Sequence, residues 1–221
     1  LADSGALTAR VVGALWWDRH RGPEQIDDLL AQREAASAAA APGVAGFFPT
    51  TVKIMTDGVM ENHTVALLEP YCDGCGGHTE NHGLSYLDAG ELRAAVTELD
   101  RLDFQVHMHA IGDRAVRNAL DAVESARLAN GHNDNRHHIA HVQLVQPEDL
   151  ARFAELEVIV NAQTYWAQSE PQMDELPIPF LGIDRARLQY PFEALRTWGA
   201  RLCMGSDWSV TSPDPMAAIH V

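Results

Sequence analysis

The chain has 221 residues, enough for one large domain or two small ones, and its 46% of hydrophobic residues are enough for a sizeable core. Its formal net charge of −15 at pH 7 argues against nucleic acid and against an anionic membrane surface as partners. No apolar run reaches the roughly 18 residues of a transmembrane helix. The 3 cysteines, an odd number, do not make a disulfide framework, so we expect a protein of the reducing cytoplasm.

Stretches typical of strands alternate along the chain with stretches typical of helices. The first, Leu7 to Trp17, is rich in apolar and aromatic residues, and we expect a buried strand there. Pro23 suits the first position of an alanine-rich helix, which should end near Pro42-Gly43. The second strand is expected from Thr51 to Met55, with Lys53 in its middle.

The position of Lys53 leaves two interpretations open. Charged side chains are rarely fully buried, so in an isolated antiparallel strand this lysine would point to solvent. In a parallel sheet with both faces covered, it would instead point inward and need a partner. The repeated alternation of strands and helices favours the parallel sheet and therefore weakens the first interpretation.

A loop rich in Gly, Pro, Asn and His spans residues 69–87, which is longer than most connections within a domain. It contains Cys72 and Cys75, followed by His78 and His82, four side chains that are able to bind zinc. The glycines between them leave little local structure to hold such a site in shape. We therefore favour a lid or substrate loop over a structural zinc site.

The segment after this loop has clear boundaries. Asp88-Ala89-Gly90-Glu91 is a capping-box pattern, which predicts the start of a helix. The next strand turns into a helix at Gly112-Asp113, and that helix should stop at Asn130-Gly131. His107 and His109 lie two residues apart in this strand, so their side chains share a face. A rigid strand that directs two imidazoles to one side suits metal binding.

Three further strands are expected within residues 136–143, 158–162 and 201–208. Together with those near residues 10, 53 and 106, they make six strands separated by helices. This alternation is typical of a (β/α) barrel or of a doubly wound sheet. No glycine-rich nucleotide-binding motif follows any strand, which disfavours the second architecture.

Four side chains with useful chemistry fall at or near the carboxyl ends of four different strands: Lys53, His109, His141 and Asp207. Barrel enzymes place their catalytic groups at this end. A single histidine at a strand end is more often hydrogen-bonded structure, and that is our interpretation of His137 and His138. Packing alone does not explain the combination of a lysine, two histidines and an aspartate in this strand order.

The sequence around these residues resembles the amidohydrolase superfamily, and within it the amidohydrolase family 3 group of YtcJ-like metal-dependent hydrolases. Four stretches carry the resemblance: VKIMTDG with Lys53, HAIGDRA with His109, RHHIAH with His141, and GSDWSVTSPDP with Asp207. The resemblance implies an α/β fold, a partial TIM (β/α)8 barrel that covers roughly strands 3 to 8. Residues 1–221 would then form a single but incomplete catalytic barrel domain.

The resemblance also implies a reaction. One or two divalent metal ions, usually zinc, would sit above the carboxyl-terminal face of the barrel. Lys53 would be carbamylated and bridge them, and His109 and His141 would bind the more exposed ion. Asp207 would bind the other ion and act as the catalytic residue, exchanging a proton with a metal-activated hydroxide. The target would be a carbon–nitrogen bond in a small amide-type substrate other than a peptide.

Four further side chains are candidates for the substrate pocket: His107, Tyr165, Trp166 and Trp208. Core packing explains the three aromatic ones about as well. The superfamily's HxH pair on the first strand and its small β-sandwich have no counterpart in this sequence. We therefore expect an internal fragment of a longer hydrolase, whose open sheet edges a homo-oligomer would cover. The alternative is a truncated or degenerate relative that binds a ligand or partner without catalysis.

Overall fold

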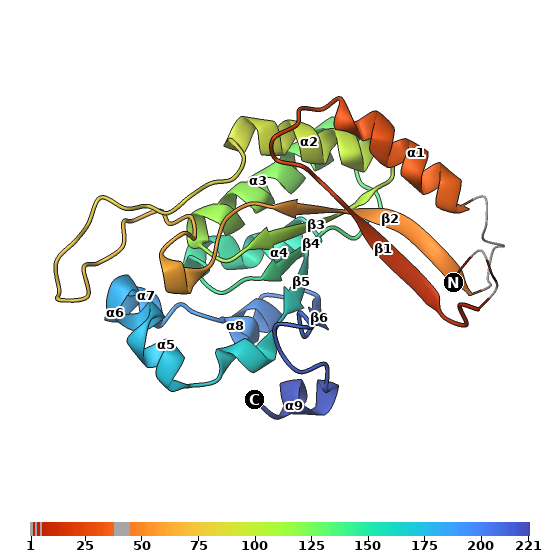
Figure 1. The fold of residues 1–221 in the computed structure, drawn as a ribbon. Helices are drawn as coiled ribbons and strands as arrows, with labels where there is room; N and C mark the ends of the chain where they lie inside the picture. The colour runs from red at the N-terminus through yellow and green to blue at the C-terminus, as the bar shows by residue number, and fades with distance from the viewer. Residues whose placement is uncertain (1, 3, 5, 38–44) are drawn as a thin grey trace.

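A computed structural model describes residues 2, 4, 6–37 and 45–221. At its centre is a parallel sheet of six strands in the order β1-β2-β3-β4-β5-β6 (Figure 1). A strictly sequential order is what successive βα units give when a sheet curls toward a barrel. The sheet is open, because within the described residues β1 pairs only with β2 and β6 only with β5. This curled half-barrel confirms the predicted partial TIM barrel.

All six predicted strands are present, although their bounds differ from those expected. They are β1 (Arg10–Trp16), β2 (Gly46–Met55), β3 (Gln105–Ala110), β4 (His138–His141), β5 (Ile159–Ala162) and β6 (Leu202–Met204). The α-helices are α1 (Gln25–Ser37), α2 (Ala89–Arg101), α3 (Asp113–Asn130), α4 (Leu150–Glu155), α5 (Pro171–Glu175), α6 (Pro177–Leu181), α7 (Ile183–Ala186), α8 (Phe192–Thr197) and α9 (Pro215–His220). Short 3-10 segments occur at η1 (Met60–Asn62), η2 (Pro147–Asp149) and η3 (Thr164–Ala167). None of the described helices is both long and apolar enough to cross a membrane.

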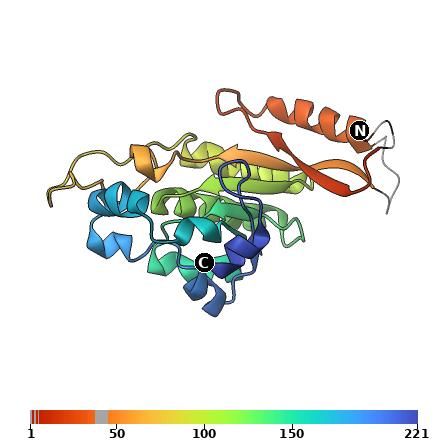
Figure 2. The same ribbon diagram turned by 60° about the horizontal axis from the view of Figure 1, so that its bottom comes forward.

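Helices α2 and α3 lie side by side and cover the sheet on the side away from the barrel interior (Figures 1 and 2). The predicted capping box starts α2: Asp88 accepts a hydrogen bond from the Gly90 N–H at 2.7 Å, and Glu91 accepts one from the Asp88 N–H at 3.3 Å. Helix α3 ends before Gly131, whose φ of 81° suits glycine. The apolar faces of both helices are buried against the strands, through Leu92, Val96, Leu99, Ala115, Val116, Ala119, Leu120, Val123 and Ala126.

Strand β1 is not the buried strand that its apolar sequence predicts. Val12 is 51% exposed and Trp16 is 61% exposed. The prediction is wrong because β1 is an edge strand, which extends with the first part of β2 away from the rest of the sheet (Figure 1). Helix α1 follows Pro23 as expected, but its expected end near Pro42-Gly43 lies outside the described residues.

A buried polar network joins the end of α2 to the start of β4. His137 Nδ1 accepts a hydrogen bond from the Val106 N–H at 3.0 Å, so its Nε2 carries the proton that it donates to Asp100 at 2.8 Å. Burial acts to raise the pKa of Asp100, but the hydrogen bonds outweigh burial and hold that pKa below its usual range. The remaining donors to this carboxylate are the amides of Asn130, Asn133 and Asn135. His137 is therefore hydrogen-bonded structure, as expected.

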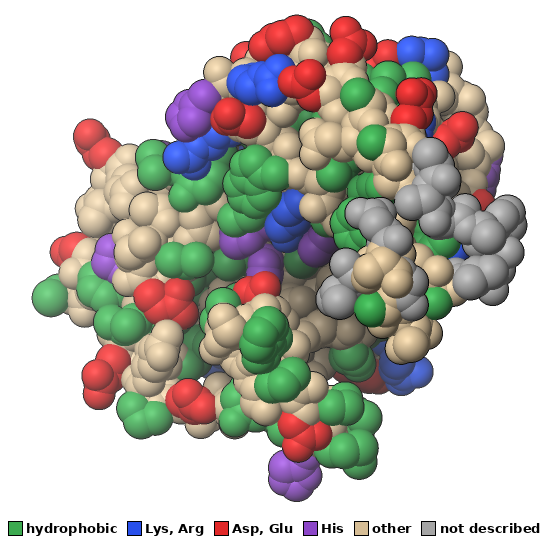
Figure 3. Space-filling model, turned by 45° about the vertical axis from the view of Figure 1, so that its right-hand side comes forward, with side chains coloured by type: hydrophobic (Ala, Val, Ile, Leu, Met, Phe, Trp, Pro, Cys, Tyr) green, Lys and Arg blue, Asp and Glu red, His purple; other side chains and the backbone are tan. Residues whose placement is uncertain are grey.

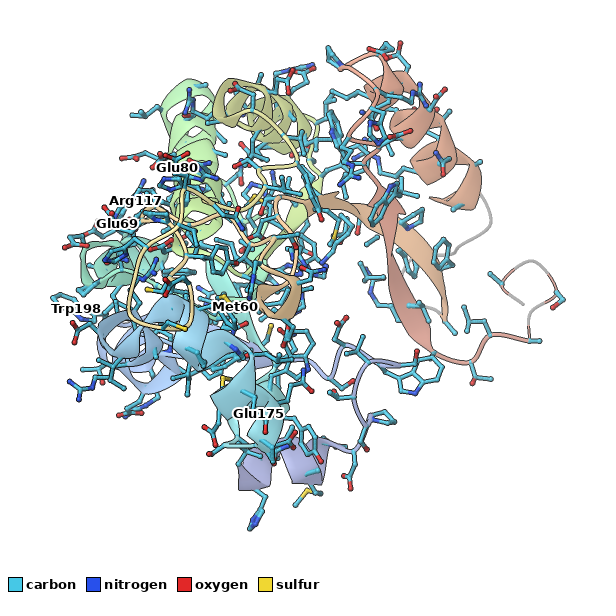
Figure 4. The ribbon with its side chains drawn as sticks, turned by 60° about the vertical axis from the view of Figure 1, so that its left-hand side comes forward. Met60, Glu69, Glu80, Arg117, Glu175 and Trp198 are labelled. Carbon is cyan, nitrogen blue, oxygen red and sulfur yellow. The ribbon has the colours of Figure 1, made fainter. Side chains whose placement is uncertain are left out.

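A second apolar cluster fixes the long connection between β2 and α2. Its buried members are Met60, Val65, Leu67, Tyr71, Ile111, Leu144 and Leu181. Figure 4 shows Met60 in the interior, whereas Glu69 and Glu80 lie on the outer side of the loop. The connection is thus anchored at its base, near the carboxyl ends of the strands, and exposed farther out.

Candidate functional site

The register of the sheet places Lys53 beside His107, and His107 beside His138. Residues paired in register point to the same face of a sheet, so these three side chains share the inner face of the half-barrel. The Lys53 amine donates to His107 Nε2 at 3.1 Å, and the rings of His107 and His138 are 4.1 Å apart. Figure 3 shows histidine side chains around a cationic side chain in a hollow of this face. Of the two interpretations of Lys53, the inward one with a partner is therefore correct.

Lys53 is the only lysine in the sequence. Burial lowers its pKa to about 8, although the nearby negative charge of Asp207 acts in the opposite direction. Burial and the lysine charge also hold the pKa of His107 well below its usual value. A lowered amine pKa increases the neutral fraction, which is the form that reacts with electrophiles such as carbon dioxide.

One ring nitrogen of His109 contacts two oxygen atoms of the protein. Its Nε2 lies 2.9 Å from the carbonyl oxygen of Gly58 and 3.4 Å from Oδ1 of Asp57. Both partners are acceptors, so Nε2 carries a hydrogen, and Nδ1 is the ring nitrogen that a metal would contact. Histidines that bind metals are commonly oriented in this way, with the second nitrogen on a carbonyl or carboxylate.

Asp57 is a site residue that the sequence analysis missed. Its side chain is fully buried and accepts backbone hydrogen bonds from Ala66 at 3.1 Å, Ile111 at 3.1 Å and Gly112 at 2.8 Å. The carboxylate thereby ties the connection after β2 to the turn between β3 and α3. The one sequence signal that could have identified Asp57 was its position just after a strand, a position that it shares with the other candidate site residues.

His141 reaches the site through an unusual backbone conformation. Alternation along β4 would direct its side chain toward the helices, on the opposite face from Ala140. Instead φ is 76° at His141 and 49° at Val142, in the left-handed region, and the ring turns to within 4.5 Å of the His109 ring. It also stacks on Trp166 at 4.8 Å. Such backbone strain is typical of functional positions.

The ring of His141 is suited to a metal. Its Nδ1 is buried and, in the part of the chain that the structure describes, has no hydrogen-bond partner. Burial holds its pKa well below the usual value, so the imidazole is neutral. A neutral ring with an unpartnered nitrogen is what a metal ligand requires.

The last of the four candidates, Asp207, follows β6 and is exposed, with a φ of 52°. Its negative charge acts on the Lys53 amine and raises the pKa of that amine, against the larger effect of burial. As the side chains stand, no three His, Cys, Asp or Glu groups among the described residues converge as a ready metal site. The donor types fit nonetheless: two imidazoles, a carboxylate, and a lysine that would present oxygen atoms as a carbamate.

A cavity of about 520 Å³ adjoins these residues. Trp166, whose ring stacks on His141, forms part of its wall, and so does Tyr165. That these two side chains contact substrate stays a prediction. His107 lies beside Lys53 instead, and Trp208 is 72% exposed. The sequence analysis missed the polar wall residues Glu61, Gln143, Glu170 and Tyr190, which come from segments that no local pattern connects.

The cysteines and histidines of the 69–87 loop do not gather around a common point. Cys72 is held against α6 and α7: its N–H donates to Phe180 at 2.8 Å, and its Sγ lies 3.5 Å from Arg185. Cys75 is an exposed free thiol. Within the described residues the structural zinc site is therefore not formed.

An inward lysine, two histidines and an aspartate at the carboxyl ends of parallel strands define a site of the barrel-enzyme type. The chain belongs to the amidohydrolase family, whose model matches residues 1–221. Protein LONG AFTER FAR-RED 3 of Arabidopsis thaliana is 32% identical over 172 residues, which are 76% of this chain and 28% of that protein. Putative amidohydrolase YtcJ of Bacillus subtilis is 28% identical over 170 residues, 76% of this chain and 30% of that protein.

Two solved structures share this fold over nearly the whole chain. An uncharacterized metal-dependent hydrolase from Pyrococcus furiosus is 26% identical with a TM-score of 0.73, over 98% of this chain and 40% of that one. Its counterpart from Pyrococcus horikoshii OT3 is 25% identical with a TM-score of 0.76, over 99% of this chain and 40% of that one. The chain thus spans less than half the length of these relatives.

Proposed function

We propose that this chain carries the metal site of a metal-dependent hydrolase that cleaves a carbon–nitrogen bond in a small, non-peptide amide-type substrate. The observation that carries the proposal is the inward position of the sole lysine, Lys53, on the strand next to the one that presents His109. The names of its relatives, an amidohydrolase and two metal-dependent hydrolases, support the same reaction class. The activity is proposed for the whole protein, since the chain spans 40% of the solved relatives.

In this proposal Lys53, His109, His141 and Asp207 hold one or two divalent ions, of which zinc suits the imidazole and oxygen donors best. Bound there, the metal would act as a Lewis acid and lower the pKa of water toward about 7. The Asp207 carboxylate accepts the proton of the attacking water and returns it to the leaving nitrogen. Because Asp207 is exposed, it has access to both.

Other residues orient or shield three of these four side chains. The Gly58 carbonyl and Asp57 fix the ring of His109 through its Nε2. Trp166 covers one face of His141 and restricts water there. His107 accepts from the Lys53 amine and keeps it directed inward. The three free thiols, Cys72, Cys75 and Cys203, are in keeping with a reducing cytoplasm, the location that we propose.

A second candidate function is a non-catalytic relative that binds a ligand or partner. The observation that favours it is that no three His, Cys, Asp or Glu side chains converge in the part of the chain described. This candidate predicts ligand binding without turnover under any metal supplement.

The test is hydrolysis of a panel of N-acyl amides and carbamates by the purified protein with zinc, cobalt or manganese and bicarbonate. His109→Ala should lose bound metal and hydrolysis together. His132→Ala removes an exposed histidine that pairs with Glu157 on the surface, away from the four proposed ligands, and it should keep both. Retention of both properties in His109→Ala would refute the assignment.

A further inference from the structure

The cavity beside His141 is lined by acidic and amide side chains. Its wall holds two carboxylates, Glu61 and Glu170, together with Gln143, Gln168 and Gln172. None of the lining residues, all from the described part of the chain, is a lysine, arginine or histidine. Two carboxylates without a compensating cation make the potential in this cavity negative, and low-dielectric walls strengthen it.

Glu61 is held in place at the wall. Gln172 donates to its Oε1 at 3.3 Å and so links η1 to α5, more than a hundred residues apart in sequence. Its negative charge reaches the deeper wall, because the pKa of the Tyr190 phenol is raised first by burial and then by Glu61. The charge of this carboxylate therefore acts on an aromatic residue of the same wall.

The remaining wall is aromatic. Tyr165, Trp166 and Tyr190 all contribute, and the Trp166 ring continues from the cavity to the ring of His141. The faces of tryptophan and tyrosine rings attract cations through their quadrupoles. An aromatic wall that also carries two exposed carboxylates is suited to the recognition of organic cations.

We propose that this cavity binds the part of the substrate remote from the scissile bond and selects a positively charged group there: a protonated amine, a guanidinium or a quaternary ammonium. The inference rests on the proposed function, in which the scissile bond lies at Lys53 and the two histidines, next to Trp166. Substrates whose remote group ends in a carboxylate are disfavoured, because Glu61 and Glu170 repel them.

The first experiment needs no turnover. Calorimetric titration of the whole chain with benzyltrimethylammonium, benzyl alcohol and phenylacetate compares a cation, a neutral molecule and an anion on one aromatic scaffold. The cation should bind about fivefold tighter than the alcohol, and phenylacetate weakest. Added salt should weaken the binding of the cation, since the carboxylates are exposed.

Variants assign the effect to the cavity. Glu61→Gln and Glu170→Gln should each weaken binding of benzyltrimethylammonium about two- to fivefold. The matched control is Glu175→Gln: Glu175 is an exposed carboxylate of α5 that does not line the cavity (Figure 4), and its variant should bind as the wild type does. Both glutamates are exposed, so their amide variants should fold, and circular dichroism checks this.

Binding of phenylacetate as tight as that of the cation would overturn the inference. Unchanged cation binding in a variant that combines Glu61→Gln with Glu170→Gln would also overturn it. The proposed function and the cation site can be refuted independently of each other. Cation-selective binding without hydrolysis of any substrate under metal supplement would remove the function and keep the cation site. Hydrolysis that prefers substrates with an anionic remote group would keep the function and remove the cation site.

Discussion

The buried carboxylate of Asp57 offers a sharp test of how the site is built. Replacing it by alanine leaves the N–H groups of Ala66, Ile111 and Gly112 without their acceptor. A buried N–H that loses its partner costs about 1–3 kcal/mol, and such losses are not fully additive. We therefore expect Asp57→Ala to lower the free energy of unfolding by about 3–5 kcal/mol. For a chain of this size the melting temperature should fall by roughly 10 °C.

Urea unfolding followed by circular dichroism measures this change. Asp73→Ala is the matched control, because Asp73 also accepts backbone hydrogen bonds, from Cys75 and Gly77, but is exposed. Its variant should stay within about 1 kcal/mol of the wild type. A destabilisation by Asp57→Ala no larger than that of the control would refute the reasoning.

Three further outcomes are expected. His137→Ala should destabilise the chain by about 3 kcal/mol, since it breaks a buried pair with Asp100, whereas the exposed His132→Ala should change unfolding by less than about 1 kcal/mol in urea titrations. Because the folded pKa of Asp100 is lowered, its contribution is present above its unfolded value near about 4 and is lost as the pH falls through the folded value. The stability gap between the wild type and Asp100→Asn should therefore shrink from pH 6 to pH 3, and a constant gap would count against this. With 13C-labelled bicarbonate, NMR should show one side-chain carbamate, absent in Lys53→Met, because Lys53 is the sole lysine.

Much of the fold was predictable because its signals are local. The capping box at Asp88 and the glycine after Asn130 each act within one turn of a helix, and both predictions are confirmed. The exposure of β1 could not be predicted from local signals. Its residues are apolar, but exposure depends on which strand lies beside it, and that is a property of the whole sheet.

The candidate site also has parts that follow from local sequence signals and parts that depend on the whole fold. The shared face of His107 and His109 follows from strand periodicity, since residues two apart share a face. The inward side of Lys53 was only favoured, by the alternation of strands and helices. The orientation of His141 could not be predicted, because its left-handed φ reverses the side that alternation predicts. The role of Asp57 depends on backbone groups up to 55 residues away, and the cavity wall joins Glu61 to Gln172. Such contacts become visible only when the chain is folded.

The central claim is that Lys53, His109, His141 and Asp207 together hold a divalent metal. Elemental analysis of the purified chain, prepared with and without bicarbonate, tests it most directly. We predict about one or two zinc equivalents in the presence of bicarbonate. Less should bind without bicarbonate, and little in Lys53→Met or His109→Ala. Full metal content in both variants, or no metal in the wild type with bicarbonate, would contradict the account.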